Sequence, residues 1–155
     1  MKRRTCLAGL VALPFAARAH HGWSSFDPDR PIFLQGRVVA VKWQNPHAEL
    51  IVELPADYRV PADLAARQVP NQTAPIDGKA LLARATAPRR QDRRWEIELA
   101  PLTRLNDWKV SPIATGTTVG VLGYTLKDEK GEAVLRAEYL YVDGKVYGLR
   151  SSPAS

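Results

Sequence analysis

Residues 32–54 read IFLQGRVVAVKWQNPHAELIVEL, and their pattern decides the fold. Branched residues alternate with others from Ile32 to Trp43, which predicts a long strand, and Gly36 in its middle offers a place for a bulge that bends it. Asn45-Pro46 predicts a turn, and apolar residues alternate again from His47 to Leu54. The stretch therefore predicts a hairpin of two curved strands.

The alternation recurs further along the chain. Strands are expected at Arg94–Leu99, Thr118–Leu126, Ala133–Val142 and Lys145–Leu149, and Pro101–Trp108 fits one or two turns of helix. Three strands, a helix and then further strands is the order of the OB-fold. We therefore expect an all-β protein with one short helix, an OB-fold-like small β-barrel of five to six antiparallel strands.

One segment interrupts this order. Residues 55–91 are rich in proline and alanine and predict an insertion, with short helices around Asp63–Arg67 and Gly78–Ala85. We expect one domain over residues 20–150, since this length suits a single core, and a disordered Ser/Pro/Ala tail over residues 151–155.

Residues 1–19 have the three parts of an export signal: basic residues at 2–4, an apolar run from 6 to 17, and Ala17-Arg18-Ala19 as a cleavage site. The apolar run has about 12 residues, too few for a membrane-spanning helix. We expect a periplasmic protein, exported by the Sec or the twin-arginine route, with no transmembrane segment after cleavage.

Composition excludes several classes of partner and ligand. The formal charge is +6, but four of the 22 basic residues and none of the 16 acidic residues lie within residues 1–19, so nucleic acid is not expected as a partner. Cys6 and Met1 are the only sulfur-bearing residues, and both lie in the signal. The mature chain therefore has no disulfide and no soft sulfur ligand.

The histidines fall in two places. His20 and His21 follow the expected cleavage site, and His47 begins the second strand. Cleavage after Ala19 would give His20 a free α-amine beside its imidazole, and His47, or otherwise His21, would supply a third nitrogen. Such nitrogen ligation favours copper as Cu(II). The alternative is that His20 and His21 belong to a frayed terminus while His47 caps a strand.

Other side chains would support such a metal site. Glu49 shares a strand face with His47 and is expected to accept a hydrogen bond from its ring and so orient it, or else to serve as a weak ligand. Trp23 and Trp43 lie near the histidines and would shield the metal, or else pack the N-terminal segment onto the barrel. Trp95 and Trp108 have the spacing of core residues.

A basic stretch occupies the end of the insertion. It consists of Arg84, Arg89, Arg90, Arg93 and Arg94. We expect a solvated loop that is balanced locally by Glu96 and Glu98 on a solvent face of the third strand.

Enzyme motifs are lacking, and no catalysis is expected. The sequence has no Gly-x-Ser-x-Gly, no His-Glu-x-x-His and no Gly-rich phosphate loop. A hydrolase that pairs His47 with Ser24 or Ser25 is disfavoured, and a copper oxidase acting on a polymer would need a flat aromatic face that the sequence does not show. The alternative of another class is a metal-free module that binds a second envelope protein through an edge strand or the insertion.

Several short motifs together carry a family resemblance. They are Ala19-His20-His21 with Trp23 and Phe26, the strand Leu34–Val39, Trp43–His47, Leu122-Gly123-Tyr124 and Asp143-Gly144-Lys145. In these the chain resembles a family of small exported bacterial proteins of unknown function. The resemblance implies an exported small β-barrel and no established activity.

Overall fold

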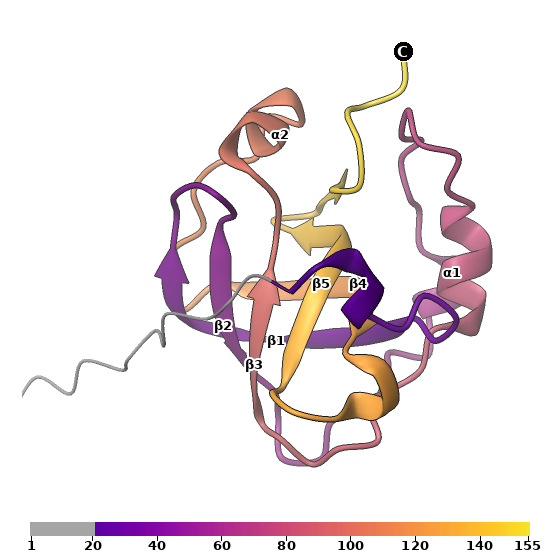
Figure 1. The fold of residues 1–155 in the computed structure, drawn as a ribbon, viewed down its shortest axis with the longest axis vertical. Coiled ribbons are helices and arrows are strands. Elements are labelled where there is room, and N and C mark those ends of the chain that lie inside the picture. Colours follow the sequence, from indigo (N-terminus) through magenta and orange to yellow (C-terminus); the bar gives the residue numbers. More distant parts are fainter. Residues whose placement is uncertain (1–20) are drawn as a thin grey trace, which may run out of the picture.

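A computed structural model describes residues 21–155 and shows a small closed β-barrel (Figure 1). The strands of this part are β1 (Ile32–Lys42), β2 (Glu49–Glu53), β3 (Arg94–Glu98), β4 (Thr118–Thr125), β5 (Val134–Val142) and β6 (Lys145–Gly148). Their order is β3-β2-β1-β4-β5-β6, and a further β3–β5 pairing closes the first five into a ring. The expected all-β barrel is confirmed, with one difference: β3 and β5 run parallel rather than antiparallel.

The hairpin of β1 and β2 forms as predicted, but its bulge is displaced. The register is irregular between Val38 and Ala40, not at Gly36. Gly36 serves another purpose: a Cβ atom there would overlap the backbone carbonyl of Glu53, so only glycine lets the strands approach this closely. The strand thus bends where its pairing passes from β4 to β2.

Short helices fill the connections. They are η1 (Trp23–Ser25), η2 (Leu64–Ala66), α1 (Gly78–Arg84), α2 (Leu102–Asp107) and η3 (Lys127–Glu129). Helix α2 lies between β3 and β4, as the OB-fold order predicts, and its Leu105 is fully buried in the barrel core. The side chain of Asn45, in the β1–β2 turn, accepts a hydrogen bond from the backbone N–H of Leu102 at 3.0 Å. This satisfies one of the unpaired amides at the start of the helix.

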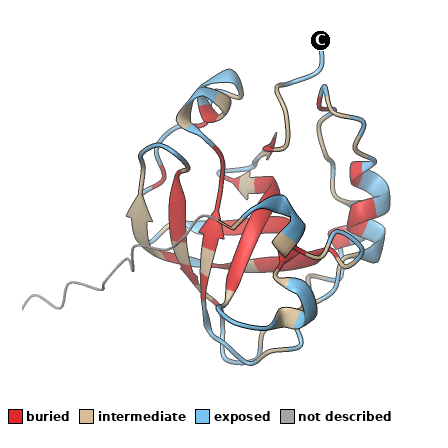
Figure 2. Ribbon diagram, in the orientation of Figure 1, coloured by how far each residue is buried: buried red, intermediate tan, exposed pale blue. Residues whose placement is uncertain are grey.

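Most strand residues are buried (Figure 2). Their side chains form two apolar clusters, one on each face of the sheet. Ile32 and Leu34 point into the barrel, whereas Phe33 between them points outward. The outward cluster is covered by the insertion, which contributes Leu64 from η2 and both Leu81 and Leu82 from α1. The insertion is therefore part of the folded domain and packs on the outer wall of β1, β4 and β5.

The C-terminal tail differs from the disordered segment that the sequence predicts. The backbone N–H of Thr73 donates to the carbonyl of Ser152, and the N–H of Ala154 donates to the carbonyl of Asn71. The indole N–H of Trp108 donates to the carbonyl of Ser151 at 2.8 Å. Backbone pairing with the insertion orders the tail despite its small polar residues. In residues 21–155 no helix is long and apolar enough to cross a membrane.

Candidate functional site

The N-terminal segment lies against the outer wall of the barrel. Phe26 is 1% exposed and belongs to the outward apolar cluster. It forms an isolated bridge with Leu126, and the N–H of Asp27 donates to the carbonyl of Thr125 at 3.0 Å. These contacts fix the path of the chain just after the histidines.

Arg136 on β5 joins this segment to the wall. Its guanidinium donates to the Glu98 carboxylate on β3 at 2.5 and 2.8 Å, and to the backbone carbonyl of His21 at 2.6 Å. Glu98 and Arg136 are both buried. The prediction that Glu98 lies on a solvent face is therefore wrong: the strand alternation is correct, but the N-terminal segment and Arg136 cover this side of the sheet.

The same wall continues onto β2. Glu49 lies directly opposite Glu98 in the antiparallel β2–β3 ladder, and Lys42 donates to the Glu49 carboxylate at 3.2 Å. Opposed side chains on one sheet face lie about 5 Å apart at Cβ. Two carboxylates and two cations thus form a row across the wall, which gives it a dense but balanced charge.

His47 lies next to this row. Ala48 points into the barrel core, so His47 and Glu49 on either side of it face outward. The His47 side chain is half-buried, and its Nδ1 atom is buried. The turn that precedes it is held by the bond from Leu102 to Asn45.

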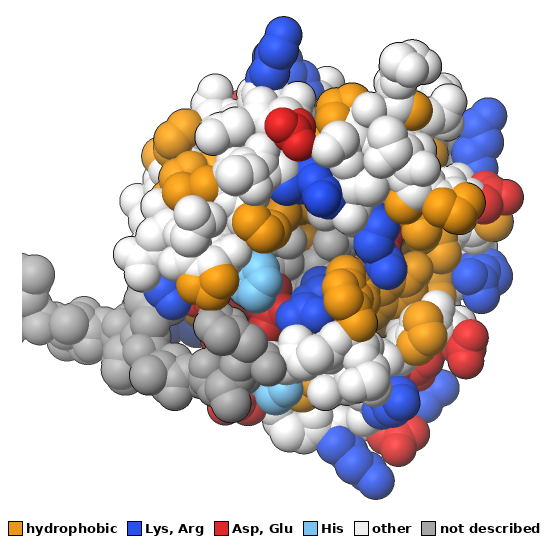
Figure 3. Space-filling model, turned by 45° about the horizontal axis from the view of Figure 1, so that its top comes forward, with side chains coloured by type: hydrophobic (Ala, Val, Ile, Leu, Met, Phe, Trp, Pro, Cys, Tyr) orange, Lys and Arg blue, Asp and Glu red, His pale blue; other side chains and the backbone are white. Residues whose placement is uncertain are grey.

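The predicted metal ligands are only partly within the described residues. His20 lies outside them. The Nε2 atom of His21 is 3.9 Å from a Glu132 carboxylate oxygen, and the ring meets Phe26 edge-on at 6.2 Å. Figure 3 shows histidine side chains, in pale blue, at the surface of the face that it presents. Residues 21–155 contain no group of three or more His, Cys, Asp or Glu side chains arranged to hold a metal ion.

Trp23 and Trp43 have different surroundings. Trp43 is partly buried and packs against the barrel core. Trp23 is 45% exposed, with the Arg150 guanidinium 3.7 Å and the Arg136 guanidinium 4.8 Å from its ring centre. Trp23 therefore packs the N-terminal segment onto the barrel, which is one of the two roles that the sequence leaves open.

Arg150 is itself tied to a buried acid. It donates to the Glu138 carboxylate at 2.7 and 3.0 Å, and Glu138 is fully buried. Burial raises the pKa of Glu138, and the hydrogen bond and charge of Arg150 oppose this shift. Gln72 of the insertion donates to the other oxygen of Glu138 at 3.4 Å and accepts from the N–H of Ser151 at 2.9 Å.

The predicted tryptophan core positions agree with the structure. Trp95 is fully buried in the barrel core, and Trp108 packs against it. Their indole N–H groups donate to the backbone carbonyls of Asp92 and Ser151.

The basic stretch is balanced by nearby acids, but Glu98 is not one of them. Glu53 pairs with Arg93 and Arg94, and Asp92 pairs with Arg90. Glu98 is taken by Arg136 instead. The charge balance is local, as predicted, but it comes from neighbouring strands and turns.

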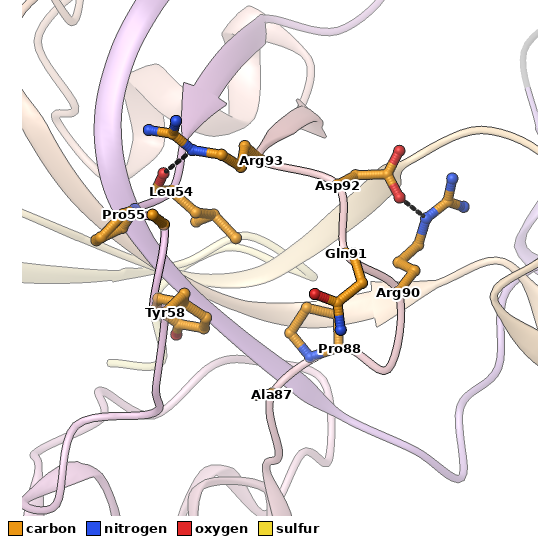
Figure 4. A pocket seen from close by; sticks show the side chains of 10 residues that line it. Leu54, Pro55, Tyr58, Ala87, Pro88, Arg90, Gln91, Asp92 and Arg93 are labelled. Atoms are coloured by element: carbon orange, nitrogen blue, oxygen red, sulfur yellow. Dashed lines mark hydrogen bonds and ion pairs between the residues drawn. The ribbon is translucent and has the colours of Figure 1, made fainter.

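A small pocket of about 100 Å³ lies where the insertion leaves and rejoins the barrel (Figure 4). Its polar walls are already engaged: Arg93 donates to the carbonyl of Leu54, and Arg90 donates to Asp92. The Tyr58 hydroxyl donates to the carbonyl of Phe33 at 2.6 Å, and burial raises its pKa. These contacts make the pocket a structural joint between insertion and barrel.

Sequence reasoning missed Glu98, Arg136, Glu138 and Arg150 as members of the site. A signal for two of them was present. Arg136 and Glu138 stand two apart within an otherwise apolar strand, which places opposite charges on one face of a buried element. Charges in such a setting require partners from elsewhere in the chain.

One protein-family model matches part of the chain. Residues 8–59 match the model of a family of unknown function, DUF6152. The match includes β1, the Asn45-Pro46-His47 turn and β2. No curated protein and no solved structure matches the chain.

Proposed function

We propose that this protein binds a metal ion, Cu(II), through an N-terminal histidine site on the outer wall of the barrel. The observation that carries the proposal is the hydrogen bond from Arg136 to the His21 carbonyl. It holds the segment next to the N-terminal histidines on the sheet face that also bears His47. The ligands would be the amine and imidazole of His20, with His47, or otherwise His21, as the third nitrogen donor.

The strand register indicates how far His47 lies from Arg136, the residue that holds the His21 carbonyl. Arg136 pairs with Glu98, and Glu98 pairs with Glu49, two residues beyond His47. Two strand spacings and two residue steps put the Cα atoms of Arg136 and His47 about 12 Å apart. Arg136, which holds the His21 carbonyl, and His47 therefore belong to the same wall of the barrel.

The charges of the wall also suit a cation. Glu132 lies beside the His21 ring, while Glu49 and Glu98 line the strands below. Arg136 and Lys42 neutralise part of this charge. The role proposed for Glu49 is to orient the His47 ring, with its Lys42 contact holding the carboxylate in place.

The biological role that we propose is metal handling or delivery in the periplasm after removal of residues 1–19. The chain offers imidazole and amine nitrogen, which suit Cu(II), and no sulfur after residue 19. Small barrels of this type use the face of the second and third strands for ligands, which is here the wall of Glu49 and Glu98. That parallel rests on fold alone.

The proposal is tested with protein purified with His20 as its first residue. We expect tight Cu(II) binding by calorimetry and nitrogen hyperfine structure in the electron paramagnetic resonance spectrum. Protein with an acetylated His20 amine is the matched control, and its affinity should fall because the blocked amine can no longer bind the metal. A flat titration of the native-terminus protein would overturn the proposal.

A second candidate function is metal-free binding of another envelope protein. It is favoured by a groove of about 420 Å³ between the insertion and the β5–β6 hairpin, lined by residues that include Arg67, Tyr141 and Val146. Both predicted contact regions, an edge strand and the insertion, border this groove. Metal analysis of protein isolated from the periplasm separates the two candidates, since only the first requires copper.

A further inference from the structure

We infer that residues 21–25 form a latch, closed by Trp23 on Arg136 and Arg150, that positions His21 on the barrel wall. The inference rests on the proposed metal site and adds Trp23 to it as a positioning residue. The latch turns about Phe26, which is the buried end of the segment.

The two ends of the segment differ in burial, although the Arg136 guanidinium lies over both rings, 4.8 Å from the centre of Trp23 and 4.4 Å from that of Phe26. Phe26 is 1% exposed and lies in an apolar cluster, so hydrophobic burial fixes it. Trp23 is 45% exposed and is the only exposed large apolar side chain in the described part of the chain. Its ring is held mainly by cations, which interact with the π face of an indole. Such a contact opens at a much lower cost than the burial of Phe26.

The surface beneath Trp23 is built from distant parts of the sequence. Arg136 is fixed by Glu98 of β3, and Arg150 is fixed by the fully buried Glu138 of β5. Glu138 is in turn bound by Gln72 of the insertion. Strand, insertion and tail therefore converge to present two guanidinium groups to one indole. Both guanidinium groups are held by carboxylates whether or not Trp23 lies on them. Closing the latch therefore orders few additional groups.

Latch closure and metal binding are coupled in this arrangement. The Arg136 bond to the His21 carbonyl is made only when the segment lies on the wall. A ligand that requires the closed segment favours closure, and closure raises the affinity for that ligand by the same factor. Trp23 would thus set metal affinity without touching the metal.

The test compares Trp23→Leu with Trp23→Phe, which keeps an aromatic face. Arg67→Gln is the matched control, because Arg67 lies over the rings of Phe33 and Tyr141 in another part of the surface. Hydrogen–deuterium exchange of residues 21–27 in the metal-free protein reports the latch directly. Calorimetry with Cu(II) reports the site.

We expect Trp23→Leu to speed exchange in residues 21–27 by about tenfold, the loss of two cation–π contacts. Cu(II) binding should weaken only as far as the closed fraction falls, and by no more than the same factor. Trp23→Phe should recover part of both effects, and Arg67→Gln should change neither. The thermal midpoint should change little in all three variants, because none of them opens the core.

The outcomes separate the two ideas. Unchanged exchange in Trp23→Leu overturns the latch, whatever happens to copper. Exchange in residues 21–27 that copper does not slow, in protein whose wild type binds copper, overturns the positioning role and leaves the metal site standing. A flat copper titration of the wild type overturns the proposed function and the positioning role with it, while the exchange data still show whether the segment is latched.

Discussion

The side-chain oxygen of Asn45 accepts a hydrogen bond from the backbone N–H of Leu102. One residue thereby joins the β1–β2 turn to the first turn of α2, which follows β3. His47 comes two residues later and takes its position from this joint. In the Asn-Pro-His sequence, Asn45 therefore stabilises the fold and His47 is the candidate metal ligand.

Replacing Asn45 with alanine should lower the free energy of unfolding by about 1 kcal/mol, the usual cost of losing a helix cap. Urea unfolding measures the change. Gln44→Ala is the control, because Gln44 is an exposed neighbour with a similar side chain. An equal loss in both variants would show that the bond to Leu102 does not stabilise the fold.

Removing the charge of Arg136 should lower the free energy of unfolding by far more than the loss of the Asn45 hydrogen bond. Arg136→Met leaves the Glu98 carboxylate buried without its guanidinium partner, and loss of one member of a buried pair costs about 3–5 kcal/mol. The double variant with Glu98→Leu should recover a large part of this loss, since no buried charge then remains. Urea unfolding of both variants tests this.

Arg94→Met is the comparison for Arg136→Met. The Arg94 side chain is 54% exposed and pairs with Glu53 at the surface. Its loss should cost less than about 1 kcal/mol. If the double variant is as unstable as Arg136→Met, the buried charge is not the cause.

Glu129 should make stability depend on pH in the acid range. Although burial opposes ionisation, bonds from Arg30 and from the backbone N–H groups of Arg89 and Arg90 hold the pKa of Glu129 below its ordinary value of 4.5. The unfolded chain therefore takes up the proton first. The stabilisation is fully present above pH 4.5 and is lost as the pH falls through the lower pKa of the folded state.

Glu129→Gln should accordingly lower the free energy of unfolding at pH 7 by about 2 kcal/mol. The difference from wild type should shrink as the pH falls below 4.5. Asp128→Asn is the neighbouring control, because the Asp128 side chain is 77% exposed and pairs with Lys130 at 3.8 Å. A pH-independent deficit in Glu129→Gln would mean that packing, rather than charge, is responsible.

His47 and His21 should contribute unequally to Cu(II) binding. His47 is held by the turn that Asn45 fixes just before β2, whereas His21 precedes Phe26, the first buried residue of the N-terminal segment. A ligand held by the fold saves ordering entropy, so His47→Ala should weaken binding by about tenfold or more. His21→Ala should cost less, as measured by calorimetry. The reverse order would indicate a local N-terminal chelate with no part for His47.

The sequence predicts the barrel because its strands obey a simple alternation. Leu50, Val52, Trp95 and Ile97 are buried as the pattern requires, and α2 lies between β3 and β4 as expected. The pattern was insufficient where one segment covers another. The alternation predicts that Glu98 is exposed, because it indicates the face of the strand on which a side chain lies and not what packs on that face.

Of the candidate site, the sequence alone indicates only the histidines, because the chain has so few of them. Arg150 looks like an ordinary surface charge in the sequence, and the apolar strand around Arg136 shows that it needs a partner but not which one. Those partners, Glu98 and Glu138, come from other strands or lie 12 residues away, so no local pattern links them. The sequence of the tail predicts disorder for a similar reason: its order comes from hydrogen bonds to the insertion, which the local sequence does not indicate.

The parallel pairing of β3 with β5 has a consequence for how the chain folds. Glu96 meets Val134 and Glu98 meets Arg136 across nearly 40 residues of intervening chain. The hairpins of β1 with β2 and β5 with β6 are local and form early, whereas this seam closes a long loop and is entropically costly. Ring closure is therefore the step that we expect to set the folding rate, and until it is complete the edges of β3 and β5 are exposed to pairing with other chains.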